Sequence, residues 1–322
     1  MKRLTVIAML LALCVTVLPF GVSAKETLIP VGQVVGLNLG DESMVIVGFD
    51  SILGAEAQKA GLQIGDKITN INGRSIHCTE DILKALKTHD GTADVRYIRD
   101  GKTKCAKVQP IKTENGLRLG IYLKQGISGV GTVTWYDPDS GTFGALGHGV
   151  NTGNGQLVSV EKGTLYRASV LSVVKGKAGE PGQLIGNLRD KTPIGEIRKN
   201  VQQGVFGTVN NGWQGTELPV ADNDEIRTGA AVIRSNVSGD QVQEYSVEIL
   251  KIYPNSRDGG RNMLIKVTDP ALLQTTGGIV QGMSGSPIIQ NGKLIGAVTH
   301  VLVNDPTRGY GIFIENMLDA AA

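Results

Sequence analysis

The sequence predicts a mostly β protein, α+β overall, built from two domains. The chain has 44 glycines but only 4% aromatic residues. Glycine destabilises helix interiors by about 1 kcal/mol relative to alanine, so this composition favours short strands joined by tight turns. A length of 322 residues suffices for two hydrophobic cores. Along the chain, a mixed module with one helical segment gives way to a long run of hairpins.

The first 24 residues predict a targeting segment. Lys2 and Arg3 precede an apolar run, and Val22 and Ala24 suit a signal-peptidase site, so residues 1–24 are a signal peptide or a membrane anchor. Both alternatives place the rest of the chain outside the cytoplasm. Removal of this segment changes the formal charge from 32 − 30 = +2 to 30 − 30 = 0. A nucleic-acid partner is therefore not expected.

Residues 28–112 are expected to form a small module, followed by a linker over 113–124. Strand-like stretches, "MVIVGFD" and "DVRYIRDGK", flank a helical pattern at residues 80–87, which Thr79 can cap. Between them, residues 60–76 combine an Ala-Gly corner, a strand with Ile68 and Ile71 inward, and an Asn-Gly turn. This pattern resembles a PDZ domain. Pairing of Cys78 with Cys105 is left open by their spacing.

The stretch "GLNL" is similar to the loop with which PDZ domains hold a peptide carboxylate. It comprises Gly36, Leu37, Asn38 and Leu39, with Asn38 where a glycine is usual. Consecutive backbone N–H groups in such a loop form an anion site, and the following strand edge accepts an extended peptide. The alternative is an apolar turn that starts a strand. The resemblance implies a peptide partner for this module.

Residues 125–322 predict a closed β architecture. "GTVTWYDPDSGTFGALGH" and "SPIIQNGKLIGAVTH" each contain two strands around a turn, the second at Asn291-Gly292, a pair suited to positive φ. Repeated hairpins over such a length fit a barrel, which removes exposed sheet edges.

The segment "GMSGSP" carries the candidate nucleophile, Ser284. Glycines at 282 and 285 let the backbone bend so that the N–H groups of Gly282 and Ser284 point toward one oxyanion beside the hydroxyl. The alternative is a small residue in a glycine-rich turn. The stretch resembles the nucleophile motif of chymotrypsin-fold serine proteases, although Met283 replaces the acidic residue used in trypsin-like zymogen activation.

A serine needs a base, and the sequence has four histidines. His77 and His89 lie in the PDZ-like module, while His300 follows the serine on a strand and is expected to line a substrate cleft. His148, in "ALGHGV", stands at a strand end upstream of the serine, as the base does in the same protease fold. Its alternative is a hydrogen-bonded turn histidine.

Taken together, the export signal, the PDZ-like module and residues 267–318 resemble the SpoIVB peptidase family. The resemblance implies an N-terminal PDZ domain followed by a chymotrypsin-like double β-barrel with His148, Asp269 and Ser284 as catalytic residues. Asp269 precedes Pro270, so a turn carboxylate is the alternative. No cofactor is implied, and no metal-ligand spacing is visible.

The family resemblance also implies a pathway. The expected protein is a self-cleaving serine endopeptidase in the space between the forespore and mother-cell membranes. It then cuts a membrane-bound regulator, which releases an intramembrane protease and activates a late sigma factor. The main rival is a non-catalytic PDZ adaptor with a protease-like barrel. An acyl hydrolase would need a strand-to-helix nucleophile elbow, whereas Ser284 leads into a hairpin.

Overall fold

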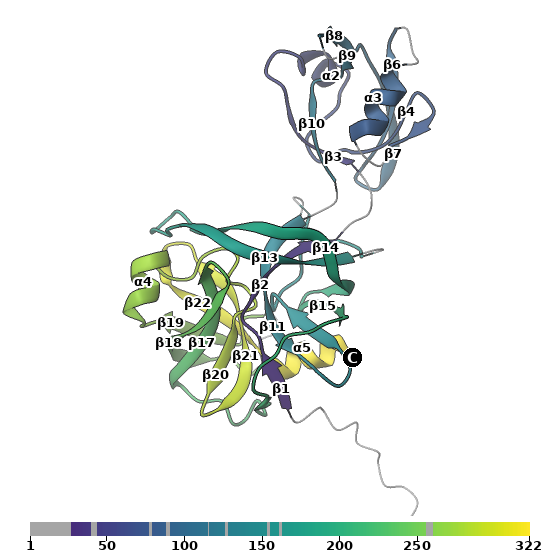
Figure 1. The fold of residues 1–322 in the computed structure, drawn as a ribbon. Coiled ribbons are helices and arrows are strands. Elements are labelled where there is room, and N and C mark those ends of the chain that lie inside the picture. The colour runs from purple at the N-terminus through teal and green to yellow at the C-terminus, as the bar shows by residue number, and fades with distance from the viewer. Residues whose placement is uncertain are drawn as a thin grey trace, which may run out of the picture.

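The computed structural model describes residues 27–39, 44–76, 79–87, 91–114, 116–125, 128–152, 155–160, 163–255 and 260–322. The expected targeting segment, His77, Cys78 and His89 lie outside these residues. Two bodies are visible in Figure 1, a small upper module and a larger lower body made almost entirely of strands. The predicted mostly β fold is confirmed.

The first barrel of the lower body closes through six strands. Each pairs with its neighbour in the order β12, β15, β14, β13, β2 and β11, and β11 pairs back to β12. β1 and β16 extend this sheet beyond β11. The bounds are β1 (Thr27–Pro30), β2 (Val34–Asn38), β11 (Ser128–Tyr136), β12 (Thr142–Ala145), β13 (Gly163–Val174), β14 (Gln183–Val201), β15 (Gly204–Val209) and β16 (Leu218–Pro219).

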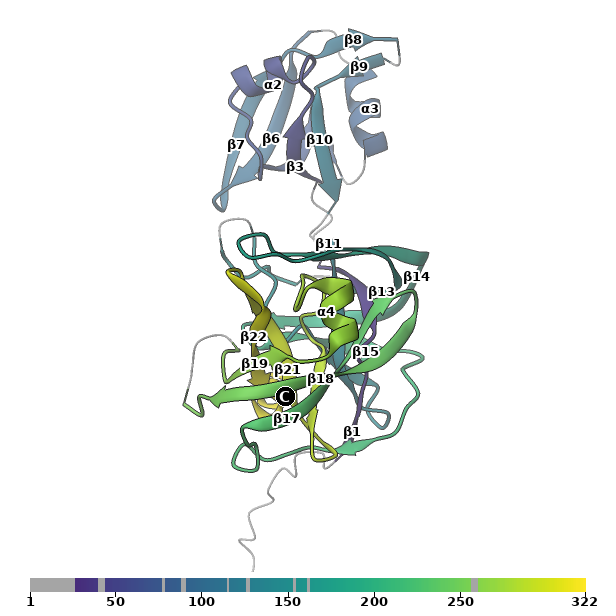
Figure 2. The ribbon, with the colours of Figure 1, turned by 90° about the vertical axis from the view of Figure 1, so that its left-hand side faces the viewer.

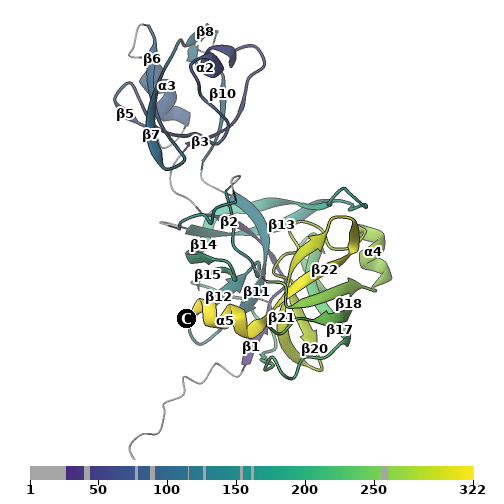
Figure 3. The same cartoon turned by 180° about the vertical axis from the view of Figure 1, so that it is seen from behind.

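The second barrel also closes through six strands, and all its neighbours are antiparallel. The predicted Asn291-Gly292 turn joins β20 to β21 with φ values of 51° and 77°. The bounds are β17 (Gly229–Ser238), β18 (Gln241–Ile252), β19 (Met263–Val267), β20 (Pro287–Gln290), β21 (Lys293–Leu302), β22 (Asp305–Phe313), α4 (Pro270–Thr276) and α5 (Ile314–Ala321). α5 lies below the first barrel, near β12 and β15 (Figure 3).

The two barrels share apolar contacts. The cluster of buried side chains in the second barrel, with Ile233 and Phe313 among them, also includes Val34, Val170 and Leu184 from strands of the first barrel. Because protein interiors are close-packed, a shared core holds the facing loops of the two barrels in fixed positions. The residues at the junction between the barrels are therefore held rigidly, as a binding or catalytic site requires.

The upper module has a core of its own, centred on fully buried Ile46, Ile68 and Ile71. Its sheet runs in the order β10, β3, β4, β6 and β7, with β5 paired to β4. The bounds are β3 (Met44–Phe49), α2 (Ala55–Lys59), β4 (Lys67–Ile71), β5 (Arg74–Ser75), α3 (Thr79–Lys87), β6 (Ala93–Arg99), β7 (Lys102–Val108), β8 (Ile111–Thr113), β9 (Gly116–Arg118) and β10 (Ile121–Gln125).

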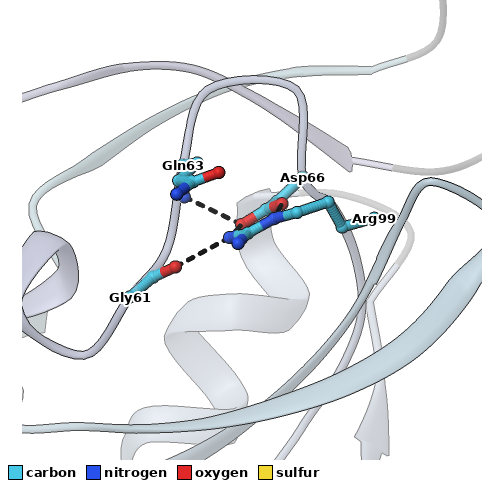
Figure 4. Close-up of polar contacts among 4 residues, drawn as sticks. All are labelled: Gly61, Gln63, Asp66 and Arg99. Carbon is cyan, nitrogen blue, oxygen red and sulfur yellow. Dashed lines mark hydrogen bonds and ion pairs between the residues drawn. The ribbon is translucent and has the colours of Figure 1, made fainter.

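A partly buried ion pair between Asp66 and Arg99 stabilises the Ala-Gly corner of this module. Asp66 is 1% exposed, and Arg99 donates to both of its carboxylate oxygens, at 2.6 and 2.7 Å (Figure 4). Arg99 also donates to the Gly61 carbonyl, and the Gln63 N–H donates to Asp66. A bidentate Arg-carboxylate pair with additional hydrogen bonds offsets much of the desolvation free energy lost when the charges are removed from water. It holds the predicted Ala-Gly corner against β6.

The expected domain boundaries need correction, because the module is inserted into the first barrel. β1 and β2, purple in Figure 1, lie in the lower body, where β2 pairs with β11 and β13. Residues 121–125 form β10 and pair with β3 inside the module, although 121–124 were expected in the linker and 125 in the barrel domain. The module thus comprises residues 44–125, and residues 27–39 belong to the barrel rather than to a domain beginning at residue 28.

No helix in the described ranges has both the length and the apolar character needed to cross a membrane.

Candidate active site

Ser284 lies in the loop between α4 and β20, and glycines shape this loop as predicted. Gly282 and Gly285 have φ values of 99° and 97°. A side chain at Gly285 would place its Cβ 2.0 Å from the Thr132 carbonyl oxygen, so only glycine fits there. The Thr132 N–H and hydroxyl donate to the carbonyls of Ser284 and Gly282. The loop of the second barrel is thereby tied to β11 of the first.

The two serines of "GMSGSP" have different surroundings. Ser286 is fully buried, and its hydroxyl donates to the Ser235 hydroxyl at 3.1 Å. Ser284 is partly exposed to a cleft, and its hydroxyl donates to the Thr299 carbonyl at 2.7 Å. Of these two serine hydroxyls, only that of Ser284 lines the cleft.

The predicted oxyanion donors are available. Among the hydrogen bonds of the described residues, none uses the N–H of Gly282 or Ser284, whereas the intervening Met283 N–H donates to the Val280 carbonyl. The Gly285 N–H donates to the Val298 carbonyl. A developing oxyanion requires unbonded N–H groups, so the role predicted for Gly282 and Ser284 stays a prediction that these hydrogen bonds allow.

His148 follows the end of β12, as expected, on a tightly bent loop. Leu146 and Gly147 both have positive φ, 69° and 67°, and the Gly147 N–H donates to the Ala145 carbonyl. Positive φ at leucine is unusual and costs free energy, so surrounding contacts must hold it. This strained turn directs the next residue, His148, into the cleft.

A backbone carbonyl sets the tautomer of His148. Its Nδ1 lies 3.0 Å from the Gly149 carbonyl oxygen, and since a carbonyl only accepts, Nδ1 carries the proton. Neutral His148 therefore has its lone pair on Nε2, the tautomer that a general base needs. Burial lowers the pKa of His148 below 6.5, although the bond to Gly149 opposes this effect.

His148 and Ser284 line one cleft of about 520 Å³ where the barrels meet. In this structure the Ser284 hydroxyl donates its hydrogen bond to the Thr299 carbonyl, so its proton is not available to His148 as acceptor until that bond is broken. None of the lining residues in the described part of the chain is charged. A cleft of this composition suits an uncharged substrate side chain, because burying an unpaired charge is costly.

Among the described residues, no hydrogen bond joins Asp269 to His148. Asp269 is the N-cap of α4, where one carboxylate oxygen accepts from the Leu272 N–H at 3.0 Å. The other oxygen accepts from the Ser246 N–H at 3.4 Å. Asp269 is absent from the residues found to line the cleft. The alternative considered for this residue, a carboxylate bonded to local N–H groups, is the arrangement observed.

Asp269→Asn is expected to keep peptide turnover within about tenfold of wild type, because asparagine also caps helices and the tautomer of His148 depends on Gly149. Asp269→Ala is expected to lose about 1 kcal/mol of stability through the missing cap. Steady-state kinetics and thermal unfolding of both variants test this. A fall of roughly 10⁴ in turnover for Asp269→Asn at unchanged melting temperature would instead place the carboxylate on His148 during catalysis.

The residues predicted to hold a peptide carboxylate lie in the barrel instead. Gly36, Leu37 and Asn38 are part of β2, and Leu37 and Leu39 line the Ser284 cleft. A side chain at Gly36 would place its Cβ 2.2 Å from Leu188, so this glycine permits close packing of β2 against β14. An apolar stretch with one glycine fits a buried strand as well as a binding loop.

A groove of the module is lined by α3 and the edge strand β10. Both elements can be followed in Figure 2. The volume of the groove is about 520 Å³, and its lining includes Ile82, Leu83 and Leu86 of α3 and Ile121 of β10. The turn at Gly120, just before β10, has φ 66°, and a Cβ there would lie 2.2 Å from the Leu53 backbone. The stretch "GLRLGIYLK" was expected in the linker, so the sequence did not predict this groove.

Two six-stranded barrels with a serine and a histidine at their junction, and a PDZ module inserted into the first barrel, define the class of protein. It is a chymotrypsin-like serine peptidase with an accessory PDZ domain. The chain belongs to the SpoIVB peptidase S55 family, whose sequence profile matches residues 115–318. A PDZ domain profile matches residues 51–109.

Other relatives share only parts of the chain. It is 48% identical over 62 residues to a Staphylococcus aureus (strain N315) protein provisionally named zinc metalloprotease SA1105, and this covers 19% of the chain and 14% of that protein. Among solved structures, the active form of Rv3671c protease from M. tuberculosis has a TM-score of 0.38 at 15% identity, over 61% of this chain and 75% of that one. The inactive form of Rv3671c has a TM-score of 0.36 at 14% identity, over 59% and 82%.

Proposed function

We propose that the protein is a PDZ-gated serine endopeptidase of the sporulation signalling pathway. In this proposal it cleaves itself and then a membrane-bound regulator, which releases an intramembrane protease that activates a late sigma factor. Membership of the SpoIVB family supports the pathway. The observation that carries the chemistry is Ser284 in one cleft with His148, whose tautomer leaves Nε2 free to act as a base.

The proposed reaction begins with rotation of Ser284 away from Thr299. Nε2 of His148 takes the hydroxyl proton as the oxygen attacks the peptide carbonyl, and the N–H groups of Gly282 and Ser284 bind the oxyanion. His148 then gives the proton to the leaving amine, which leaves an acyl-enzyme on Ser284. Water, deprotonated by His148, hydrolyses the ester and restores the serine.

Self-cleavage is proposed to occur before Thr27. β1 begins at this residue and pairs with both β11 and β16. A cut within β1 would remove one of the strands that extend the first barrel sheet, whereas a cut upstream leaves the sheet intact. Export through residues 1–24, and action in the space between the forespore and mother-cell membranes, belong to the same proposal.

A labelling experiment tests the catalytic part of the proposal. A serine-directed phosphonate should label the wild-type protein and fail to label Ser284→Ala. The wild type, incubated with the exported part of the membrane-bound regulator, should convert it to a shorter product. Absence of both labelling and conversion in folded wild-type protein would favour the non-catalytic adaptor.

The position of the PDZ module supports a gating role. The chain leaves the barrel after Leu39 and returns at Ser128, and these positions adjoin because Ser128 pairs with Asn38. Leu39 and Gly129 line the Ser284 cleft. An extended peptide added to the edge of β10 would therefore bind to a strand whose continuation, β11, forms a wall of the cleft.

Leu83→Glu is expected to block peptide binding in the groove between α3 and β10, because it places a charge among apolar side chains. Self-processing and cleavage of the regulator should fall by about tenfold or more, while cleavage of a short generic peptide should stay within about threefold of wild type. Peptide binding to the variant can be followed by calorimetry.

The matched control is Lys84→Glu, which introduces the same residue on the exposed side of α3, outside the groove. It should behave as wild type in all assays. Equal loss of short-peptide and protein cleavage in Leu83→Glu would show that the module supports the barrel and does not select substrates.

A further inference from the structure

The ring of His148 packs against the ring of His300. The ring centroids are 5.0 Å apart, and the ring planes are inclined by 36°. His300 lies on β21, directly after Thr299, whose carbonyl accepts the Ser284 hydroxyl. Two consecutive residues of one strand therefore contact the nucleophile and the base.

Packing, rather than hydrogen bonding, positions the His300 ring. Its Nδ1 is buried and has no partner in the described part of the chain. An unbonded buried nitrogen is unfavourable, so the arrangement must be held by the contacts around it. The ring face is what His300 presents to His148.

His300 is uncharged at neutral pH. Desolvation, the charge of His148 and the charge of Arg261 together lower the pKa of His300 to about 4. His148 and Arg261 are the ionisable groups that act on the pKa of His300. The guanidinium of Arg261 lies over the ring of Tyr310 on β22. A neutral imidazole face attracts a cation, whereas a second imidazolium would repel it.

We propose that His300 is a positioning residue for the general base: its uncharged aromatic face holds the His148 ring toward Ser284 and stabilises the imidazolium formed during proton transfer. This inference rests on the proposed role of His148 as base. In an aspartate-containing triad a carboxylate stabilises this cation, but here the Asp269 carboxylate is bonded to the N–H groups of Leu272 and Ser246.

Two substitutions separate the aromatic face from the rest of the side chain. His300→Phe and His300→Leu both remove the nitrogens and keep an uncharged apolar side chain, but only phenylalanine retains the ring face. His300→Phe is expected to keep kcat within about threefold of wild type. His300→Leu is expected to lower kcat by about tenfold to a hundredfold, because the imidazolium loses its aromatic partner.

The pKa of His148 provides a readout that a merely structural role would not change. Its titration is followed by NMR in the full chain carrying Ser284→Ala, which needs no turnover. With leucine at 300 the pKa of His148 should fall below that of the parent protein, and with phenylalanine it should not. Melting temperatures identify a misfolded variant, and His300→Met replaces His300→Leu if the latter does not fold.

Equal kcat values for the phenylalanine and leucine variants would overturn the proposal, as would an unchanged His148 pKa in both. His148→Ala distinguishes this failure from failure of the proposed function. If His148→Ala retains activity, His148 is not the base and the proposed mechanism fails, whatever the result at His300. If His148→Ala is inactive while the two His300 variants are alike, only the role of His300 is refuted.

Discussion

Ser284→Ala is expected to lower kcat for a peptide substrate by roughly 10⁵ to 10⁶ and to abolish self-processing. Its hydroxyl is the only one of the two in "GMSGSP" that faces the cleft, and the substitution removes one oxygen and one hydrogen bond, to Thr299. The fold should therefore persist. Peptide hydrolysis, phosphonate labelling and thermal unfolding of the purified variant measure these effects.

Ser286→Ala is the matched control two positions away. It should retain turnover, because the Ser286 hydroxyl is buried and bonded to Ser235. Its expected cost is about 1 kcal/mol of stability, the usual contribution of one buried hydrogen bond. An inactive Ser286→Ala together with an active Ser284→Ala would reverse the assignment of the nucleophile.

His148→Ala should be nearly as inactive as Ser284→Ala, and wild-type activity should rise with pH through one ionisation. Only neutral His148 accepts the serine proton, so activity is lost as pH falls through its pKa. Because burial disfavours the cation and lowers this pKa, the midpoint should lie below 6.5 and activity should be level at neutral pH. The pH profile of kcat/KM measures the midpoint in the free enzyme.

A midpoint clearly above 6.5 would contradict this assignment, because the structure places no carboxylate in the described part of the cleft to stabilise the imidazolium. His300 does not titrate near neutral pH, since its pKa is lowered to about 4. Substantial activity in His148→Ala would require another base.

Local residue order was sufficient to predict the glycine-rich loop at Ser284 and the hairpins, and the resemblance to the SpoIVB family predicted the class of enzyme. Positive φ at Gly282, Gly285 and Asn291-Gly292 follows from residue types that tolerate this conformation, whatever surrounds them. Such properties depend on neighbours in sequence. The inward placement of both Ile68 and Ile71 was predicted and both are fully buried, but side chains three apart lie on opposite faces of a regular strand, so their common burial needs the register shift between β4 and β6.

The PDZ insertion and its groove depended on which strands pair across the molecule. "GLNL" and "RLGI" both place glycine among apolar residues, and nothing local distinguishes a barrel strand from a peptide-binding edge. The first became β2 because β11 and β13 pair with it, and the second leads into β10, whose partner is β3. Pairing between residues tens of positions apart was decided by the packing of the whole chain.

Residue order alone predicted Ser284 as the nucleophile and placed His148 after a strand end. The groups around these two residues could be found only from the folded chain. Asp269 is bonded to the N–H groups of Leu272 and Ser246, the Gly149 carbonyl sets the tautomer of His148, and His300 packs on its ring. Hydrogen bonds and ring contacts act over a few ångströms in space, and the barrel junction brings together residues that are remote along the chain.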